Sequence, residues 1–113
     1  MRLNEKTIDR TVIYNGSIID LEVHDVELPD GSTSKRELVF HHGAVAVCAI
    51  TPENEVLLVK QFRKPADQPL LEIPAGKLEK GEDRKEAAIR ELQEETGYIA
   101  SDLQFVTNMY GSP

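Results

Sequence analysis

The chain has 113 residues, 40% of them hydrophobic, and a formal net charge of -7. This charge excludes a sequence-independent nucleic-acid binder, which needs basic groups to neutralise phosphates. No apolar run is long enough to cross a membrane. The lone Cys48 excludes a disulfide within the chain, and we expect it to be a small buried core residue. The N-terminal sequence lacks the apolar segment of a secretory signal peptide, so a cytoplasmic location is expected.

Residues 7–40 show strand patterns without helical periodicity. Apolar residues alternate over 19–23, and the alternation slips at 24–25, which predicts a β-bulge there. The Pro-Asp-Gly sequence at 29–31 predicts a turn, and 37–40 a return strand. We therefore expect a small antiparallel sheet in this region.

The boundary between two domains is expected near His41 and His42. Adjacent histidines in a strand point to opposite faces, and no cysteine or third histidine lies at ligand spacing. We interpret them as interface or solvent residues. The N-terminal sheet then forms a domain over residues 1–42, expected to mediate dimerisation, and the main domain covers residues 43–113.

Four apolar segments predict strands in the main domain. Residues 44–50 form a continuous apolar run suited to a buried strand, and 56–62 follow after a turn. Residues 70–73 form a short third strand, and 103–109 a fourth. A mixed sheet with a helix packed on it is the expected result, an α/β or α+β fold.

A capped helix is predicted from Asp83 to Glu95, because Glu86 stands three residues after Asp83 and Gly97 suits a C-terminal stop. An apolar stripe and an acidic stripe lie side by side on this helix. The apolar stripe comprises Ala88, Ile89 and Leu92, and the acidic stripe comprises Glu91, Glu94 and Glu95.

The acidic stripe suggests a metal site. Carboxylates at this spacing repel one another by a few tenths of a kcal/mol per close pair on an exposed helix. A hard cation such as Mg²⁺, held by one or two carboxylates and substrate phosphates, relieves the repulsion. Arg90 can reach back toward Glu82, so we expect it to fix carboxylate rotamers. The alternative is a solvated acidic helix with ordinary ion pairs.

The segment from Gly76 to Tyr98, GKLEKGEDRKEAAIRELQEETGY, resembles the Nudix box of the Nudix hydrolases without a gap. Tyr98 stands where an aliphatic residue is more usual. The resemblance implies an α/β/α Nudix sandwich and a substrate in which a nucleoside diphosphate is linked to another moiety. It also implies Mg²⁺, with Mn²⁺ as the alternative, and assigns roles to six residues. The metal ligands would be Glu91, Glu95, Glu94 (direct or through water) and the Ala75 carbonyl, and Glu82 and Arg90 would be the supporting pair.

Pro113, sixteen residues after Gly97, is similar to the proline of the ADP-ribose pyrophosphatase subgroup, as are the segments 59–65 and 71–76. This resemblance implies hydrolysis of ADP-ribose to AMP and ribose 5-phosphate by a homodimer. It further implies substrate contacts by Arg36, Glu37 and Arg63. The alternatives are a cross-strand charged pair for the first two and a surface cation for Arg63.

The family fold continues beyond the length of this chain, with a loop glutamate assigned as general base or extra metal ligand. We therefore expect the chain to be incomplete at its C-terminus and its own activity to depend on the rest. Three alternatives stay open: a Nudix hydrolase of another nucleoside diphosphate derivative, a non-catalytic nucleotide-binding protein, and a structural acidic helix in an unrelated domain.

Overall fold

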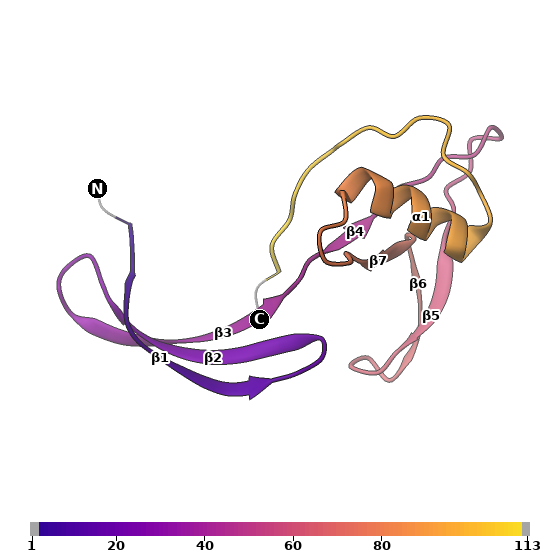
Figure 1. The fold of residues 1–113 in the computed structure, drawn as a ribbon. Helices are drawn as coiled ribbons and strands as arrows, with labels where there is room; N and C mark the ends of the chain where they lie inside the picture. The colour runs from indigo at the N-terminus through magenta and orange to yellow at the C-terminus, as the bar shows by residue number, and fades with distance from the viewer. Residues whose placement is uncertain (1–2, 112–113) are drawn as a thin grey trace. The chain divides into compact units, whose positions relative to one another are not determined.

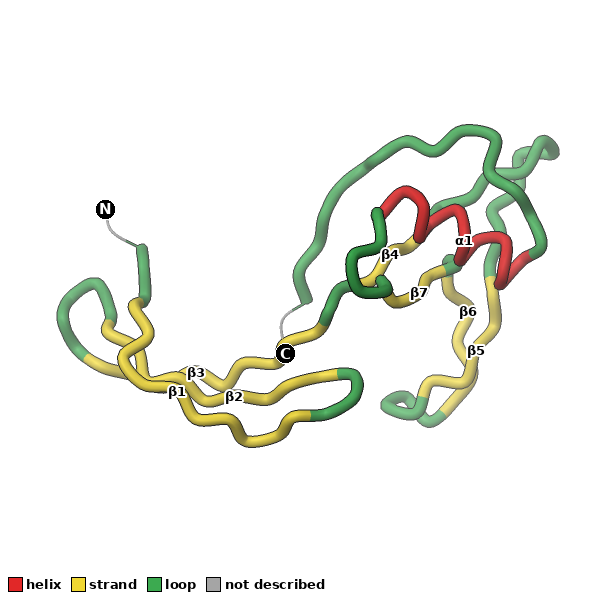
Figure 2. Tube along the Cα trace, viewed as in Figure 1, coloured by secondary structure: helices red, strands yellow, loops and turns green. Residues whose placement is uncertain are grey.

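The computed structural model describes residues 3–111 (Figures 1 and 2). Contacts divide the chain into two units, the first ending at His42 and the second beginning at Gly43. Pro113, on which part of the subgroup prediction depends, lies outside the described residues.

The first unit is a three-stranded antiparallel sheet. Its strands are β1 (Lys6–Asn15), β2 (Ile19–Glu27) and β3 (Thr33–His41), paired in the order β1-β2-β3. In the turn between β2 and β3, Asp30 Oδ1 accepts hydrogen bonds from the Ser32 backbone N–H (2.9 Å) and hydroxyl (2.6 Å). Gly31 supplies the left-handed conformation, with φ of 88°. The predicted antiparallel sheet and turn are confirmed.

The predicted bulge at residues 24–25 of β2 is wrong. The β2–β3 register runs without interruption through both residues, whereas β1 shifts register against β2 between Thr7 and Asp9 and again between Val12 and Tyr14. The change in apolar pattern along β2 has another cause. Glu22 occupies a buried position, 6% exposed, where Arg10 and His24 bind its carboxylate.

The second unit packs one helix on antiparallel strand pairs. Strand β4 (Ala44–Ala46) pairs with β7 (Ala75–Lys77), and β5 (Val59–Arg63) pairs with β6 (Gln68–Glu72). Helix α1 (Arg84–Thr96) contacts β4 and β7, as Figure 1 shows. The buried centre of this unit comprises Val47, Ala88 and Leu92. This arrangement has the predicted class of fold.

The expected buried strand over 44–50 is shorter than predicted. After Ala46 the chain leaves the strand, and its backbone hydrogen bonds no longer follow a regular ladder. The Val47 N–H donates to the Pro74 carbonyl (2.8 Å), and the Leu57 N–H donates to the Ala49 carbonyl (3.0 Å). Because alternate residues of this run face the core, Cys48 lies on the opposite side and is exposed. The expectation of a buried cysteine is wrong.

The predicted fourth strand over 103–109 is also wrong. These residues are described, and none of them belongs to a strand. Leu103 packs against the core of the unit, whereas Phe105 is 74% exposed, so the apolar pattern that suggested a strand is not buried along its length. A strand needs a neighbour to satisfy its backbone groups, and here no described strand supplies one.

Candidate functional site

Helix α1 begins and ends where the sequence predicts. Asp83 caps its N-terminus by accepting a hydrogen bond from the Glu86 backbone N–H (3.1 Å). Gly97, with φ of 78°, ends it and donates its N–H to the Gln93 carbonyl (2.9 Å). The buried residues Ala87, Ala88 and Leu92 hold the helix on the strands, with Ala87 in place of the predicted Ile89, so the adjacent carboxylates are fixed relative to β7.

Glu91 lies directly on the backbone of Gly76. The β4–β7 ladder places Gly76 opposite Val45, under α1. A Cβ atom added at Gly76 would collide with the carboxyl group of Glu91. Glycine is therefore required for the carboxylate to approach the strand, which is the close backbone approach that the sequence indicated. Ala75 is the neighbouring residue on β7, so its backbone lies beside this contact.

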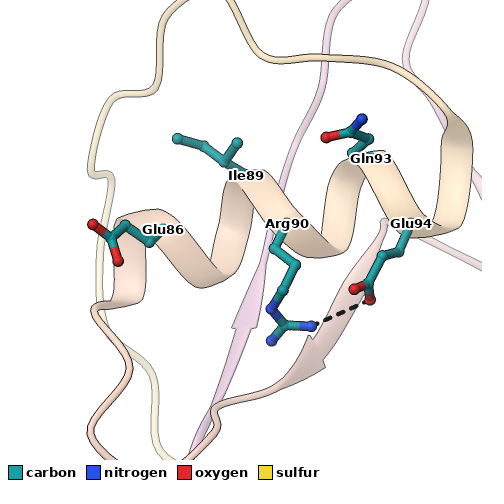
Figure 3. A pocket seen from close by; sticks show the side chains of 5 residues that line it. All are labelled: Glu86, Ile89, Arg90, Gln93 and Glu94. Carbon is teal, nitrogen blue, oxygen red and sulfur yellow. Dashed lines mark hydrogen bonds and ion pairs between the residues drawn. The ribbon is translucent and has the colours of Figure 1, made fainter.

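Arg90 gathers three of the predicted site carboxylates. Its Nε and Nη2 donate to the two carboxylate oxygens of Glu82 at 2.8 and 2.9 Å. Its Nη1 donates to Glu91 Oε1 at 2.9 Å and to Glu94 Oε2 at 3.2 Å, the last bond being drawn in Figure 3. The guanidinium lowers the pKa of Glu82, and the Glu82 carboxylate raises the pKa of Arg90. The predicted pairing of Arg90 with Glu82 is confirmed.

Glu95 carries a buried oxygen without a partner. Its Oε2 atom is inaccessible to solvent and has no hydrogen-bond partner among the described residues. A buried carboxylate oxygen without a donor is costly, so such an atom points to a missing positive group. Glu95 stands one helical turn after Glu91, which places both carboxylates on the same side of α1.

The three acidic residues differ in their surroundings. The Glu91 side chain is 14% exposed, whereas that of Glu94 is 57% exposed and turned to Arg90. Within residues 3–111, no group of three or more histidine, cysteine, aspartate or glutamate side chains is arranged to hold a metal ion. The structure thus brings Glu91 and Glu94 together through Arg90 without gathering all three carboxylates, and their metal roles stay predictions.

The residues nevertheless fit a divalent cation. Glu91 and Glu95 offer hard oxygen donors, and one of these oxygens is buried without a partner. Mg²⁺ takes one or two protein carboxylates and completes its shell with water and phosphate, so it needs no larger protein cluster.

A surface pocket lies along one side of α1 (Figure 3). It is lined by Glu86, Ile89, Arg90, Gln93 and Glu94. Two predicted site residues, Arg90 and Glu94, therefore reach an open surface.

Arg63, a predicted substrate contact, lies at the end of β5. Its Nε and Nη2 donate to Glu72 at 2.6 Å each, and Nη2 also donates to Gln61 Oε1 at 2.5 Å. The Glu95 carboxylate contributes to the raised pKa of Arg63, after Glu72. Sequence reasoning gave no role to Gln61 or Glu72. A hairpin alignment of 59–63 with 68–72 was the signal that would have found them.

The other two predicted substrate contacts lie in the first unit. Arg36 forms two bonds of 2.9 Å with the Glu5 carboxylate, and Glu37 stands opposite Val23 in the β2–β3 ladder. The partner of Arg36 is thus a residue that precedes β1, which differs from the cross-strand pair considered as the alternative.

No helix in residues 3–111 is both long enough and apolar enough to cross a membrane.

Comparisons with known proteins match both units. The NUDIX domain family matches residues 40–112, and the nucleoside diphosphate sugar hydrolase N-terminal domain matches residues 5–39. The chain is 58% identical to an ADP-ribose pyrophosphatase of Bacillus subtilis (strain 168) over 98% of its own length and 60% of the relative. It is 54% identical to a methanol dehydrogenase activator of Bacillus methanolicus over 96% of its own length and 59% of the relative.

A solved structure has the same fold. The crystal structure of an ADP compounds hydrolase superposes with a TM-score of 0.85 at 24% identity, over 100% of this chain and 62% of the other. The chain therefore spans about 60% of the relatives and of the solved structure that it matches.

Proposed function

The chain belongs to the Nudix family, and from that premise we propose that it is part of a metal-dependent hydrolase of ADP-ribose or a related nucleoside diphosphate sugar. Water would cleave the diphosphate bond of ADP-ribose to give AMP and ribose 5-phosphate. The match of residues 5–39 to the N-terminal domain of nucleoside diphosphate sugar hydrolases supports this substrate class, as does the likeness to the pyrophosphatase.

The observation that carries the proposal is the buried, unpartnered Oε2 atom of Glu95, one turn from a Glu91 carboxylate that rests on Gly76. A structural acidic helix would turn its carboxylates to solvent or to cations of the chain. It would have no reason to hold one carboxylate oxygen in a buried position without a partner.

Glu91 and Glu95 would hold Mg²⁺ or Mn²⁺, with Glu94 as a further or water-mediated ligand and the Ala75 carbonyl as a backbone ligand. When bound, such a cation neutralises the charge of the diphosphate and lowers the pKa of the attacking water. Arg90 keeps Glu82 and Glu91 in fixed rotamers through three hydrogen bonds. Arg63 would donate to the phosphates.

The first unit would form a homodimer, with Arg36 and Glu37 contacting the adenosine side of the substrate. The support is its exposed apolar surface, which a monomeric sheet seldom leaves uncovered. The exposed large apolar side chains of these strands are Ile8, Val12, Ile13, Tyr14, Val39 and Phe40. A cytoplasmic location belongs to the same proposal, because an exposed free cysteine suits a reducing compartment.

An assay can distinguish the proposal from two other functions, hydrolysis of another diphosphate and nucleotide binding without hydrolysis. The activator from Bacillus methanolicus is almost as similar as the pyrophosphatase, 54% against 58%, so identity alone does not fix the substrate. The full chain should be assayed with Mg²⁺ against ADP-ribose, other nucleoside diphosphate sugars, and dinucleotides. Release of AMP from ADP-ribose at the highest kcat/KM supports the proposal. Preference for another diphosphate changes the substrate, and binding without hydrolysis indicates a non-catalytic nucleotide-binding protein.

A further inference from the structure

The β5–β6 hairpin presents a polar cluster on one face. The ladder pairs Val59 with Glu72, and Arg63 with Gln68. Because every second residue of a strand points to the same face, Gln61, Arg63 and Glu72 share that face. The three residues form a continuous hydrogen-bonded cluster, which we name the Arg63 cluster.

The guanidinium of Arg63 is turned back along its own strand. Glu72 stands opposite Val59, four residues before Arg63, which corresponds to roughly 13 Å along the ladder. The two side chains span this separation and meet through two short, parallel bonds of 2.6 Å. Such a fork-to-fork pair fixes the plane of the guanidinium as well as its position.

One edge of the guanidinium remains open. Nε and Nη2 are bound to Glu72 and Gln61, whereas Nη1 has no hydrogen-bond partner among residues 3–111. Arginine has five N–H donors, so the two on Nη1 are available to an acceptor. The Glu95 carboxylate also acts on the charge of Arg63, which relates this cluster to the acidic side of α1.

We propose that Glu72, assisted by Gln61, is a positioning residue that holds Arg63 with its Nη1 edge directed to the diphosphate of the nucleotide substrate. The inference rests on the proposed function, in which Arg63 and a cation at Glu91 and Glu95 contact the same diphosphate. The fixed fork lowers the cost of ordering a long side chain when the substrate binds. Glu72 itself does not touch the substrate.

A second account of the same pair predicts the opposite sign. If Glu72 were only a competing anion that restrains Arg63, its removal would free a positive charge and strengthen binding of an anionic ligand. If Glu72 orients Arg63, its removal lets the guanidinium rotate and weakens binding.

The test measures ADP binding by calorimetry and ADP-ribose turnover, both with the full chain. Glu72→Gln should weaken ADP binding and raise KM by on the order of tenfold, with a much smaller change in kcat. Glu72→Asp, which keeps the charge on a shorter side chain, should recover part of the loss. The matched control is Asp67→Asn, which removes the carboxylate of the exposed Lys64 pair in the same hairpin and should leave both values unchanged.

A double-mutant cycle separates positioning from general folding effects. In an Arg63→Ala background, Glu72→Gln should produce no further loss of ADP affinity, and melting temperatures should show that all variants are folded. Tighter ADP binding by Glu72→Gln, unchanged binding, or full additivity with Arg63→Ala would overturn the inference.

Failure of the proposed function gives a different pattern. If the wild-type chain binds ADP more tightly than Glu72→Gln does but does not hydrolyse ADP-ribose, the hydrolase assignment is contradicted and the positioning role stays supported. A wild-type chain that binds no diphosphate would overturn both.

Discussion

The carboxyl group of Glu91 packs so closely on Gly76 that a side chain as small as a methyl group does not fit between strand β7 and helix α1. This contact explains why a glycine stands fifteen residues before a glutamate in a segment otherwise dominated by polar residues. It also fixes the carboxylate next to the Ala75 backbone, where the proposed cation would bind.

Gly76→Ala is therefore expected to displace Glu91. The methyl group would force the carboxylate or the helix to move, at a cost of about 1 to 3 kcal/mol in the free energy of unfolding. A shift of the Glu91 carboxylate, the proposed metal ligand, by even about 1 Å should lower kcat/KM by roughly 100-fold. Denaturant unfolding and ADP-ribose turnover measure the two effects. Gly111→Ala is the control, since a Cβ there meets nothing within 4 Å. Normal turnover by Gly76→Ala would contradict the role of this contact.

Glu95→Gln should separate catalysis from stability. The substitution removes the charge of a buried oxygen that has no donor, so the metal-free protein should change in stability by less than about 1 kcal/mol. Turnover should fall on the order of 100-fold or more, because a metal ligand is lost.

The metal dependence of the melting temperature gives a second readout for Glu95. A cation that binds the folded chain but not the unfolded chain raises the melting temperature, so Mg²⁺ should stabilise the wild type. This increase should disappear in Glu95→Gln and persist in Glu86→Gln, the control in the first turn of the same helix. An equal Mg²⁺ effect in all three proteins would remove the argument for a cation at Glu95.

The sequence predicted α1 almost to the residue, because its signals are local. The Asp83 cap, the apolar stripe and Gly97 act within a few residues of one another. The Arg90–Glu82 pair was predicted for the same reason. Strand 103–109 failed because an apolar segment forms a strand only where a neighbour pairs with it, and that partner is not coded in the segment itself.

The Arg63 cluster was missed for a related reason. Gln61 and Glu72 are ordinary polar residues eleven positions apart, and only the register of the β5–β6 hairpin brings them to the same arginine. The buried oxygen of Glu95 could not be predicted from the sequence either. Helical spacing predicts on which side of the helix a residue lies, but it does not predict the hydrogen bonds of a single atom.

The Glu82–Arg90 pair predicts how stability depends on pH. The guanidinium lowers the pKa of Glu82 in the folded chain below its ordinary value of 4.5. A carboxyl group with a depressed folded pKa stabilises the protein above its unfolded pKa, and this contribution is lost as the pH falls through the folded pKa. The wild type should therefore lose stability more steeply than Glu82→Gln below about pH 4.5. Urea unfolding followed from neutral pH to about pH 3 measures this difference, and parallel curves would contradict it.

The first unit offers a test of dimerisation on a defined row of side chains. The strand registers place Leu21 opposite Tyr14 on one side and opposite Val39 on the other, so the three apolar residues form a row across the sheet. Val39 is 61% exposed, which means that a partner, and not the core of this unit, would cover it.

Val39→Lys should therefore convert the proposed homodimer to a monomer, because the dimer would bury the lysine charge in its interface. The sheet should stay folded, because position 39 is exposed in the monomer and tolerates a charged side chain. Light scattering coupled to size-exclusion chromatography measures the mass, and circular dichroism measures the fold. Thr33→Lys is the matched control on the same face of β3, at the exposed far end of the strand, and should stay dimeric. A wild-type monomer, or a Val39→Lys dimer as stable as the wild type, would show that this row is not the interface. Substrate affinity should fall together with the dimer, since Arg36 and Glu37 are proposed to reach the adenosine side only in the assembled protein.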